Sequence, residues 1–409
     1  MSGIMAVYSE DAYDDIHPLL YQGIMSLQHR GQKGFGYVIQ DMAQYGNGLL
    51  SDVMIQSYKG NLGIASVRYA FSKDKVNEPL LPKQMGDYYI AYDGAYTDYE
   101  NKLDDLEDLH EILSKHQGAF EFVAVNHNKI VAMRDCRGVK PLVMGKQDDN
   151  WFFASESCAL ESINVTDIRD VAPGEMIIID KHGAKSIHSE NAKSAPCLFE
   201  YIYIARPDST MNGVSVYQAR KNMGKRLFEE CPTKADVVMG APDSGLIAAL
   251  GYAQASGIPY EKGIVKNRYV GRTFIEQDAR FRKASVDIKL AAIPEAVCGK
   301  EIILVEDSIV RGTTIKKLIQ ILRDHGAKKV HVRVASPPVK FEENSSIDVP
   351  NKRDLMNYGK TVEEVREMIG CDSLYYLSLD GLKEAVGSNS FYTQYFDGIN
   401  PFEGENNDL

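Results

Sequence analysis

Residues 301–334 constrain the fold of this chain more than any other stretch of its sequence. Residues 302–305 form a continuous apolar run that is typical of a strand buried in a parallel sheet. After a short polar segment, four apolar residues recur at the spacing of one helix face: Ile315, Leu318, Ile319 and Leu322. Gly326 is the expected helix end, and residues 330–334 then alternate as a second strand. This order predicts a βαβ unit within a mostly parallel, doubly wound sheet.

The junction between the first strand and the helix carries the chemistry expected of a ligand site. Glu306 and Asp307 follow the strand directly, and a turn of small and polar residues, 308–314, leads into the helix. Backbone N–H groups at such a turn attract a phosphate. The adjacent carboxylates suit the hydroxyls of a ribose, directly or through Mg²⁺. The alternative for an acidic pair alone is an ordinary turn with solvated acids.

The composition limits the other classes of function. The chain has 409 residues, enough for two or three domains, and 46 basic against 57 acidic residues give a net charge of −11. This balance argues against a protein that binds nucleic acid or a membrane surface. The absence of a long apolar stretch favours a cytoplasmic protein, and six scattered cysteines are typical of reduced thiols.

The pattern of predicted secondary structure changes near residue 190. Before that point the chain shows many short predicted strands, including residues 64–67, 88–92, 120–125, 129–133, 151–154 and 176–179. After it, strands alternate with helices. We therefore expect a first domain over residues 1–190, a second over 191–382, and a loosely attached polar tail over 383–409.

Two further stretches of the second half indicate an anion site. Residues 241–245 precede a helix of small residues, an arrangement that brings backbone amides close to a diphosphate. A concentration of cations follows within an otherwise acidic chain, including Lys266, Arg268, Arg272, Arg282 and Lys289. Local positive charge of this kind favours an anion-binding surface. A solvated basic loop is the alternative.

The 306–314 segment resembles the phosphoribosyl-pyrophosphate signature of type I phosphoribosyltransferases, although its first acid is Glu rather than the more common Asp. Nearly the whole chain is similar to the amidophosphoribosyltransferase family, through the segments 199–209, 216–220, 256–260, 336–338 and 372–378. The resemblance implies an α+β domain of the N-terminal-nucleophile (Ntn) hydrolase type, with four αββα layers. A type I phosphoribosyltransferase domain of the α/β class, with a doubly wound parallel sheet, would follow it.

The resemblance also implies a reaction, the transfer of an amino group to C1 of phosphoribosyl pyrophosphate with loss of pyrophosphate. Mg²⁺ would assist at Ser244, Glu306 and Asp307. Arg268 and Lys289 fall at catalytic positions on a closing loop. The remaining positions carried over contact the substrate: Asp243, Ser244, Gly245, Lys266, Arg272, Ser308, Ile309, Val310, Arg311, Gly312, Thr313 and Thr314.

The first half resembles the family's glutaminase domain but departs from it where the chemistry is done. The nucleophile position holds Ser2 in place of Cys. Near neutral pH a thiol is far more available than an alcohol as a nucleophile. The family's His-Asn-Gly-Asn oxyanion motif reads Tyr-Asp-Gly-Ala at residues 92–95. Loss of one such donor typically costs about 10²–10³ in rate. The stretch that holds the glutamine amino group has no counterpart, and only Arg68 remains as a carboxylate contact.

The cysteine pattern argues against one cofactor that some members of the family hold. Some members hold an iron–sulfur cluster with four cysteines, whereas here Cys197 stands alone. The other three positions hold Glu343, Tyr392 and Tyr395. We therefore expect Mg²⁺ but no iron–sulfur cluster.

The sequence thus predicts a phosphoribosyltransferase with a degenerate glutaminase domain, in purine biosynthesis. It would make 5-phosphoribosylamine from free ammonia or from ammonia of a separate glutaminase. One alternative is a regulatory pseudoenzyme that binds phosphoribosyl pyrophosphate or nucleotides together with a partner amidotransferase. Another is transfer to a different amine. The resemblance further suggests a homo-oligomer.

Overall fold

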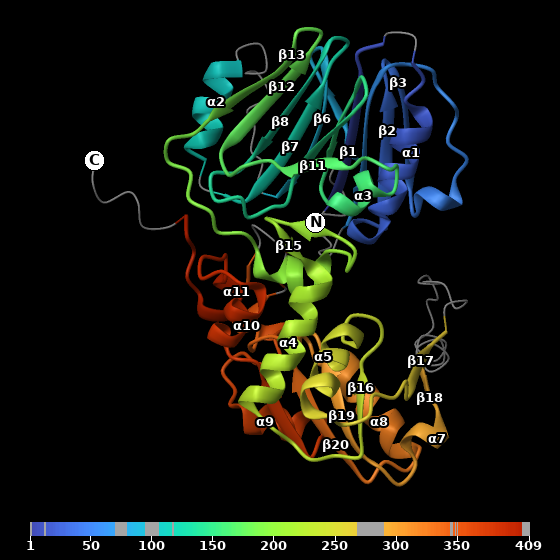
Figure 1. Cartoon of the computed structure of the whole chain (residues 1–409), viewed down its shortest axis with the longest axis vertical. Coiled ribbons are helices and arrows are strands. Elements are labelled where there is room, and N and C mark those ends of the chain that lie inside the picture. The colour runs from blue at the N-terminus through green and yellow to red at the C-terminus, as the bar shows by residue number, and fades with distance from the viewer. Residues whose placement is uncertain are drawn as a thin grey trace.

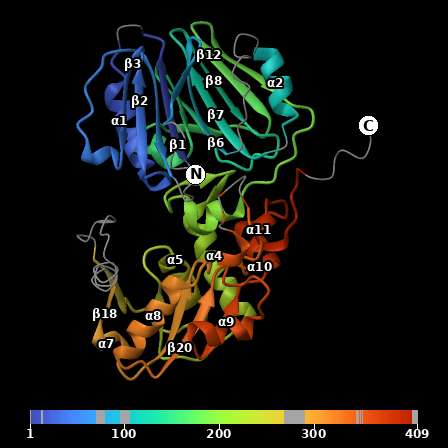
Figure 2. The same ribbon diagram turned by 180° about the vertical axis from the view of Figure 1, so that it is seen from behind.

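The structure is a computed structural model, and the chain forms an upper and a lower lobe (Figures 1 and 2). The residues that it describes are 2–11, 14–69, 80–94, 106–116, 118–267, 290–343, 347, 349 and 351–402. Two antiparallel sheets build the upper lobe and one parallel sheet the lower lobe. None of the helices in these ranges is both long enough and apolar enough to cross a membrane.

The two sheets of the upper lobe take up the first half of the chain. The seven-stranded sheet has the order β11 (Asp167–Asp170), β9 (Val143–Gln147), β10 (Asn150–Ala154), β1 (Ser2–Ser9), β4 (Leu62–Arg68), β2 (Gly34–Ile39) and β3 (Met42–Asn47). The six-stranded sheet has the order β13 (Gly183–His188), β12 (Glu175–Asp180), β8 (Lys129–Arg134), β7 (Phe120–Val125), β6 (Tyr88–Gly94) and β5 (Lys83–Met85). All six strands predicted from the sequence are present.

The layers of this lobe follow from alternation along the strands. One face of each sheet packs on the other, through residues such as Ile4 of β1 and Val123 of β7. The outer face of the larger sheet carries α1 (His17–Ser26) and α3 (Ser157–Glu161). The smaller sheet is covered by α2 (Leu106–Ser114). The predicted αββα arrangement is confirmed.

The lower lobe is built on a parallel sheet, as predicted. Its order is β16 (Val237–Gly240), β19 (Glu301–Glu306), β20 (Lys329–Val334) and β21 (Ser373–Tyr376). One face packs against α4 (Val216–Glu230) and α5 (Leu246–Ser256). The other face carries α7 (Pro294–Val297), α8 (Thr313–Asp324) and α9 (Val362–Ile369). Helices on both faces explain why residues 302–305 are continuously apolar, since no face of β19 meets water.

Helix α8 forms where the sequence predicts it. Its buried residues are the four at the predicted helical spacing, Ile315, Leu318, Ile319 and Leu322. Gly326 follows the helix with a left-handed φ of 84°, which suits a residue without a side chain. The helix begins after Gly312, which is also left-handed at φ 73°.

Shorter elements connect the two lobes and border the lower one. The pair β14 (Thr210–Met211) and β15 (Val214–Ser215) precedes α4. Strand β17 (Ile264–Lys266) pairs with β18 (Leu290–Ala292) in a separate ribbon outside the parallel sheet.

The expectation of a loosely attached tail is wrong for residues 383–402. These residues include the end of α10 (Leu379–Val386) and all of α11 (Gln394–Asp397). Tyr392 and Tyr395 are fully buried in the core that also contains α4 and α5. The sequence near the end of the chain is mostly polar, so its few aromatic residues were not recognised as part of a core. The rest of the predicted tail lies outside the described residues.

Candidate functional site

A pocket of about 490 Å³ lies beyond the carboxyl ends of β16 and β19. Parallel strands present their following turns at one edge of a sheet, so the 241–245 and 306–314 segments meet there. Its lining includes Asp243, Ser244 and Lys266 on one side and residues 306–315 on the other. The structure therefore brings together the predicted acidic pair, the predicted turn and one predicted cation.

Both acids at the end of β19, Glu306 and Asp307, are buried. Asp307 accepts hydrogen bonds from the hydroxyls of Ser244 and Ser308, the latter at 2.5 Å. Burial raises the pKa of both carboxyls, and the neighbouring Asp307 raises that of Glu306 further. Oε2 of Glu306 has no hydrogen-bond partner among the described residues. Among the described residues neither carboxyl forms an ion pair, although Arg220 lies near enough to oppose the rise of the Asp307 pKa. Two adjacent buried carboxyls of this kind fit a bound cation.

The acidic pair supplies only part of a metal shell. Within the described ranges, no group of three or more His, Cys, Asp or Glu residues could hold a metal ion. Mg²⁺ normally takes one or two carboxylates and completes its shell with water and substrate oxygens. The donor set of Glu306, Asp307 and the Ser244 hydroxyl matches that coordination preference.

The 308–314 turn offers backbone donors to an anion. The N–H groups of residues 310–314 donate to no described atom, and the turn leads into the N-terminus of α8. Unpaired amides at a helix N-terminus bind phosphate. Thr313 and Thr314 open the helix and are exposed to the pocket.

The segment after β16 faces this turn. Gly245 precedes α5, and a Cβ there would lie 2.5 Å from the Val305 carbonyl oxygen, so only glycine allows this approach. Lys266 at the end of β17 pairs with Asp243, with Nζ and Oδ2 2.5 Å apart. The predicted cations Arg268, Arg272 and Lys289 lie outside the described residues.

Sequence reasoning missed one wall of this pocket and a segment that supports its turn from outside. One is an apolar wall formed by Phe199, Tyr203, Ile204, Ile347 and Val349. The first three belong to or adjoin a short π-helix, η4 (Glu200–Ile204), that enters from the junction between the lobes. The other is the segment at residues 356–357, which packs behind the turn. Neither role is visible in the local sequence, since the first stretch meets the pocket, and the second meets the turn, only through tertiary packing.

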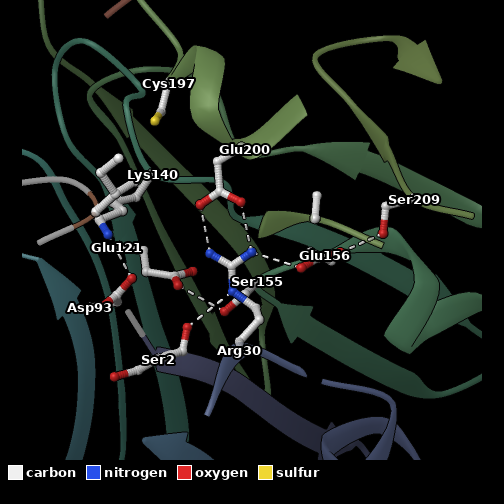
Figure 3. A network of polar contacts seen from close by, with 12 residues as sticks. Ser2, Arg30, Asp93, Glu121, Lys140, Ser155, Glu156, Cys197, Glu200 and Ser209 are labelled. Carbon is white, nitrogen blue, oxygen red and sulfur yellow. Dashed lines mark hydrogen bonds and ion pairs between the residues drawn. The ribbon is translucent and has the colours of Figure 1, made fainter. Parts of the chain in front are cut away.

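A second cluster of polar residues surrounds Ser2 in the upper lobe (Figure 3). Arg30, at the end of a 3₁₀ turn η1 (Gln28–Arg30), donates to the Ser2 carbonyl at 3.1 Å. The same guanidinium donates to Glu156 at 2.7 Å and to Glu200 at 2.8 and 2.9 Å. Burial opposes its charge, but Glu200 and Glu156 raise the Arg30 pKa well above its usual range.

The predicted oxyanion position is part of a buried ion pair. Asp93 on β6 lies 2.8 Å from Nζ of Lys140, and both side chains are almost fully buried. Burial alone would favour a neutral acid, but the Lys140 ammonium outweighs it and lowers the Asp93 pKa. Asp93 therefore stays a carboxylate, which accepts hydrogen bonds and cannot donate one.

Glu121 is a further buried acid in this cluster that sequence reasoning missed. It lies opposite Asp93 in the register of β6 and β7, and its Oε1 accepts a hydrogen bond from the Ser155 hydroxyl at 2.8 Å. Its Oε2 has no partner among the described residues. Burial, with a smaller contribution from Asp93, raises the Glu121 pKa to about 8. A hydrophobic-looking strand, Phe-Glu-Phe, gave no signal for this acid.

The four positions matched to cluster cysteines do come together. Cys197 lies 3.5 Å from the Tyr395 hydroxyl, and the Tyr392 hydroxyl donates to Glu343 at 2.9 Å. The two tyrosine rings are 6.1 Å apart. All four residues are buried, so hydrogen bonds and aromatic contacts occupy this place.

Comparisons with known proteins agree with both halves of the chain. Residues 214–362 match the phosphoribosyl transferase domain family, and residues 95–162 match the glutamine amidotransferase domain family. The chain is 39% identical to the amidophosphoribosyltransferase of Pyrococcus horikoshii over 415 residues, covering 92% of this chain and 91% of that protein. It is 37% identical to the amidophosphoribosyltransferase of Bacillus subtilis over 413 residues, covering 90% and 87%.

A solved structure shares the whole architecture. The glutamine phosphoribosylpyrophosphate amidotransferase of B. subtilis, complexed with ADP and GMP, aligns with a TM-score of 0.85 and 35% identity. The alignment covers 98% of this chain and 97% of that one. Both lobes and their connection are therefore common to the two proteins.

Proposed function

The chain belongs to the amidophosphoribosyltransferase family, and from this premise we propose that it makes 5-phosphoribosylamine with ammonia rather than with glutamine. As a member of that family it is a pentosyltransferase of purine biosynthesis. The proposal concerns the nitrogen source. Its main support is the buried Asp93–Lys140 ion pair at the position where the family places an amide donor.

The substrate sits, in this proposal, with its 5′-phosphate on the backbone amides of residues 308–314. Its ribose hydroxyls face Glu306 and Asp307, and its diphosphate faces Lys266 and the amides near Gly245. The pairing of Lys266 with Asp243 is exposed to solvent, so the ammonium exchanges partners at little cost when a diphosphate arrives. Ser244, Glu306 and Asp307 would hold Mg²⁺, which supplies charge neutralisation for the leaving pyrophosphate.

Loss of pyrophosphate leaves positive charge on the ribose ring. The carboxylates of Glu306 and Asp307 stabilise that charge electrostatically, while the 308–314 amides keep the phosphoribosyl group in place. The apolar side chains of Phe199, Ile204 and Val349 keep water from the reacting carbon. Ammonia then attacks C1 and passes its excess proton to solvent or to departing pyrophosphate, so no protein nucleophile is needed.

The Ser2 cluster gives no comparable support to glutamine hydrolysis. A tetrahedral intermediate needs donors aimed at its oxyanion, and Asp93 offers a carboxylate there. The nearby Lys140 ammonium is already held by Asp93 at 2.8 Å. The Ser2 carbonyl is fixed by Arg30, which ties β1 into the interface between the lobes. We therefore assign this lobe to packing, and ammonia to solution or to a separate glutaminase.

Pyrophosphate release with ammonium, with glutamine and without an amine tests the proposal. We expect turnover that saturates with ammonium and a glutamine rate equal to the rate without amine. A glutamine-dependent rate would overturn the assignment of the upper lobe. Binding of phosphoribosyl pyrophosphate without turnover on any donor would instead favour a regulatory protein.

A further inference from the structure

The 308–314 turn is braced from behind by a segment that touches no part of the pocket. Two carbonyls of the turn accept hydrogen bonds from consecutive residues of that segment. The Asn357 side-chain amide donates to the Ile309 oxygen at 3.1 Å, and the Met356 N–H donates to the Val310 oxygen at 2.7 Å. Asn357 is 3% exposed, so water does not compete for this contact.

These two bonds decide which way the amides of the turn point. In a planar trans peptide the carbonyl oxygen and the following N–H lie on opposite sides. Because the Ile309 and Val310 oxygens face residues 356–357, the N–H groups of Val310 and Arg311 face away from them. Residues 308–315 line the pocket and residues 356–357 do not, so the face of the turn opposite to residues 356–357 is its pocket face. Neither N–H donates to a described atom.

The orientation of the Asn357 side chain is fixed in turn by Tyr376. The Tyr376 hydroxyl, at the carboxyl end of β21, donates to Oδ1 of Asn357 at 2.8 Å. An amide whose oxygen accepts from Tyr376 must present its NH₂ group to Ile309. Both side chains are almost fully buried, and the chain of donors runs in one direction from the sheet to the turn.

From this geometry we infer that Asn357 and Tyr376 are positioning residues for substrate binding, which hold the Val310 and Arg311 amides toward the substrate phosphate. The inference rests on the proposed assignment of the 308–314 turn to that phosphate. Neither residue touches the pocket. Their effect is on affinity, because a phosphate held equally before and during the reaction contributes to KM and not to kcat.

Steady-state kinetics of three variants with ammonium tests the inference. Asn357→Ala removes the brace and should raise the KM for phosphoribosyl pyrophosphate about tenfold, with kcat nearly unchanged. Asn357→Asp keeps an acceptor for Tyr376 but turns a carboxylate to the Ile309 oxygen, and should raise KM at least as much. Tyr376→Phe keeps the donor to Ile309 and should raise KM by less.

A matched control separates this effect from lost stability. Val365→Ala creates a cavity in the core under α9, at a fully buried residue that does not line the pocket. It should lower the melting temperature and leave KM unchanged. If Asn357→Ala behaves in the same way, the residue is merely structural and the inference is wrong.

One more variant tests the assignment of the turn itself. Gly312 has a left-handed φ of 73°, which strains any residue with a Cβ, so we expect Gly312→Ala to distort the turn. We expect a raised KM. If Gly312→Ala raises KM and Asn357→Ala does not, only the brace fails. An unchanged KM in Gly312→Ala would overturn both the phosphate assignment and the brace.

Discussion

Glu121 illustrates how one buried acid can set the pH response of the upper lobe. Its folded pKa of about 8 compares with 4.5 for a free side chain. Between these values the folded protein keeps a proton that the unfolded chain has released. The free energy of unfolding therefore falls as the pH rises from about 4.5 to 8.

Glu121→Gln should remove this dependence, because an amide does not titrate and its oxygen can still accept from Ser155. Between pH 6 and 8, the free energy of unfolding should fall more steeply for the wild type than for the variant, by up to about 1.4 kcal/mol per pH unit. Melting temperatures of both proteins at several pH values provide the measurement. Parallel pH profiles would show that Glu121 is already ionised in the folded state.

The sequence identified single residues of the pocket where they followed a buried strand. Glu306, Asp307 and the turn after them were predictable, because strand, acids and helix are contiguous. Asn357 was not, since its partners Ile309 and Tyr376 are 48 and 19 residues away. A lone polar residue in an irregular segment carries no signal of such contacts.

Among the elements, α8, β19, β20 and the six named strands of the upper lobe were predictable, whereas the C-terminal helices were not. A periodic apolar face identifies a helix such as α8 that packs along its length. Helix α11 has four residues, too few to show a period. Its stability comes from aromatic packing, with the rings of Tyr395 and Phe396 4.6 Å apart and Phe199 5.1 Å from Tyr395.

Tyr395→Phe tests whether this terminal segment is part of the core. The hydroxyl accepts from the Phe199 N–H at 2.8 Å and donates to the Tyr392 carbonyl at 2.9 Å. Its removal leaves both groups buried without that partner, at a cost of about 1–3 kcal/mol. Chemical denaturation measures the change. Tyr217→Phe on α4, where the ring is 41% exposed, is the control and should change little.

An equal stability for Tyr395→Phe and the wild type would mean that the C-terminal segment is not held as described. Cys197 and the three residues around it would then need another explanation for their burial. A clear loss would establish that hydrogen bonds join the last helices to the start of the second lobe.

At the scale of the whole molecule, the two lobes are joined by buried charges. Arg30 and Glu156 belong to the upper lobe, while Glu200 begins the short helix that reaches the pocket wall. Glu156 also accepts from the Arg206 N–H at 2.9 Å and the Ser209 hydroxyl at 2.7 Å. A lobe without hydrolytic chemistry would still be needed to position residues 200–204.

Arg30→Met should therefore destabilise the protein by about 3–5 kcal/mol, since it leaves the Glu156 and Glu200 carboxylates buried without their cation. In a double-mutant cycle with Glu200→Gln, the combined loss should be smaller than the sum of the two single losses. Calorimetric unfolding supplies the values. Lys225→Ala removes an exposed pair with Glu229 and should have almost no effect.

Additive losses in that cycle would mean that Arg30 and Glu200 do not act together across the lobes. A coupled loss accompanied by a change in the calorimetric profile would show that the lobes unfold as one unit because of this contact.

The central claim is that ammonia, not the glutamine amide, supplies the nitrogen. The most direct measurement is a competition in which ¹⁵N-ammonium and unlabelled glutamine are present together with phosphoribosyl pyrophosphate and Mg²⁺. The amine product is trapped and its isotope content determined by mass spectrometry, for the wild type and for Ser2→Ala. We predict that both proteins give product carrying only ¹⁵N. Unlabelled product from the wild type that disappears in Ser2→Ala would contradict the account.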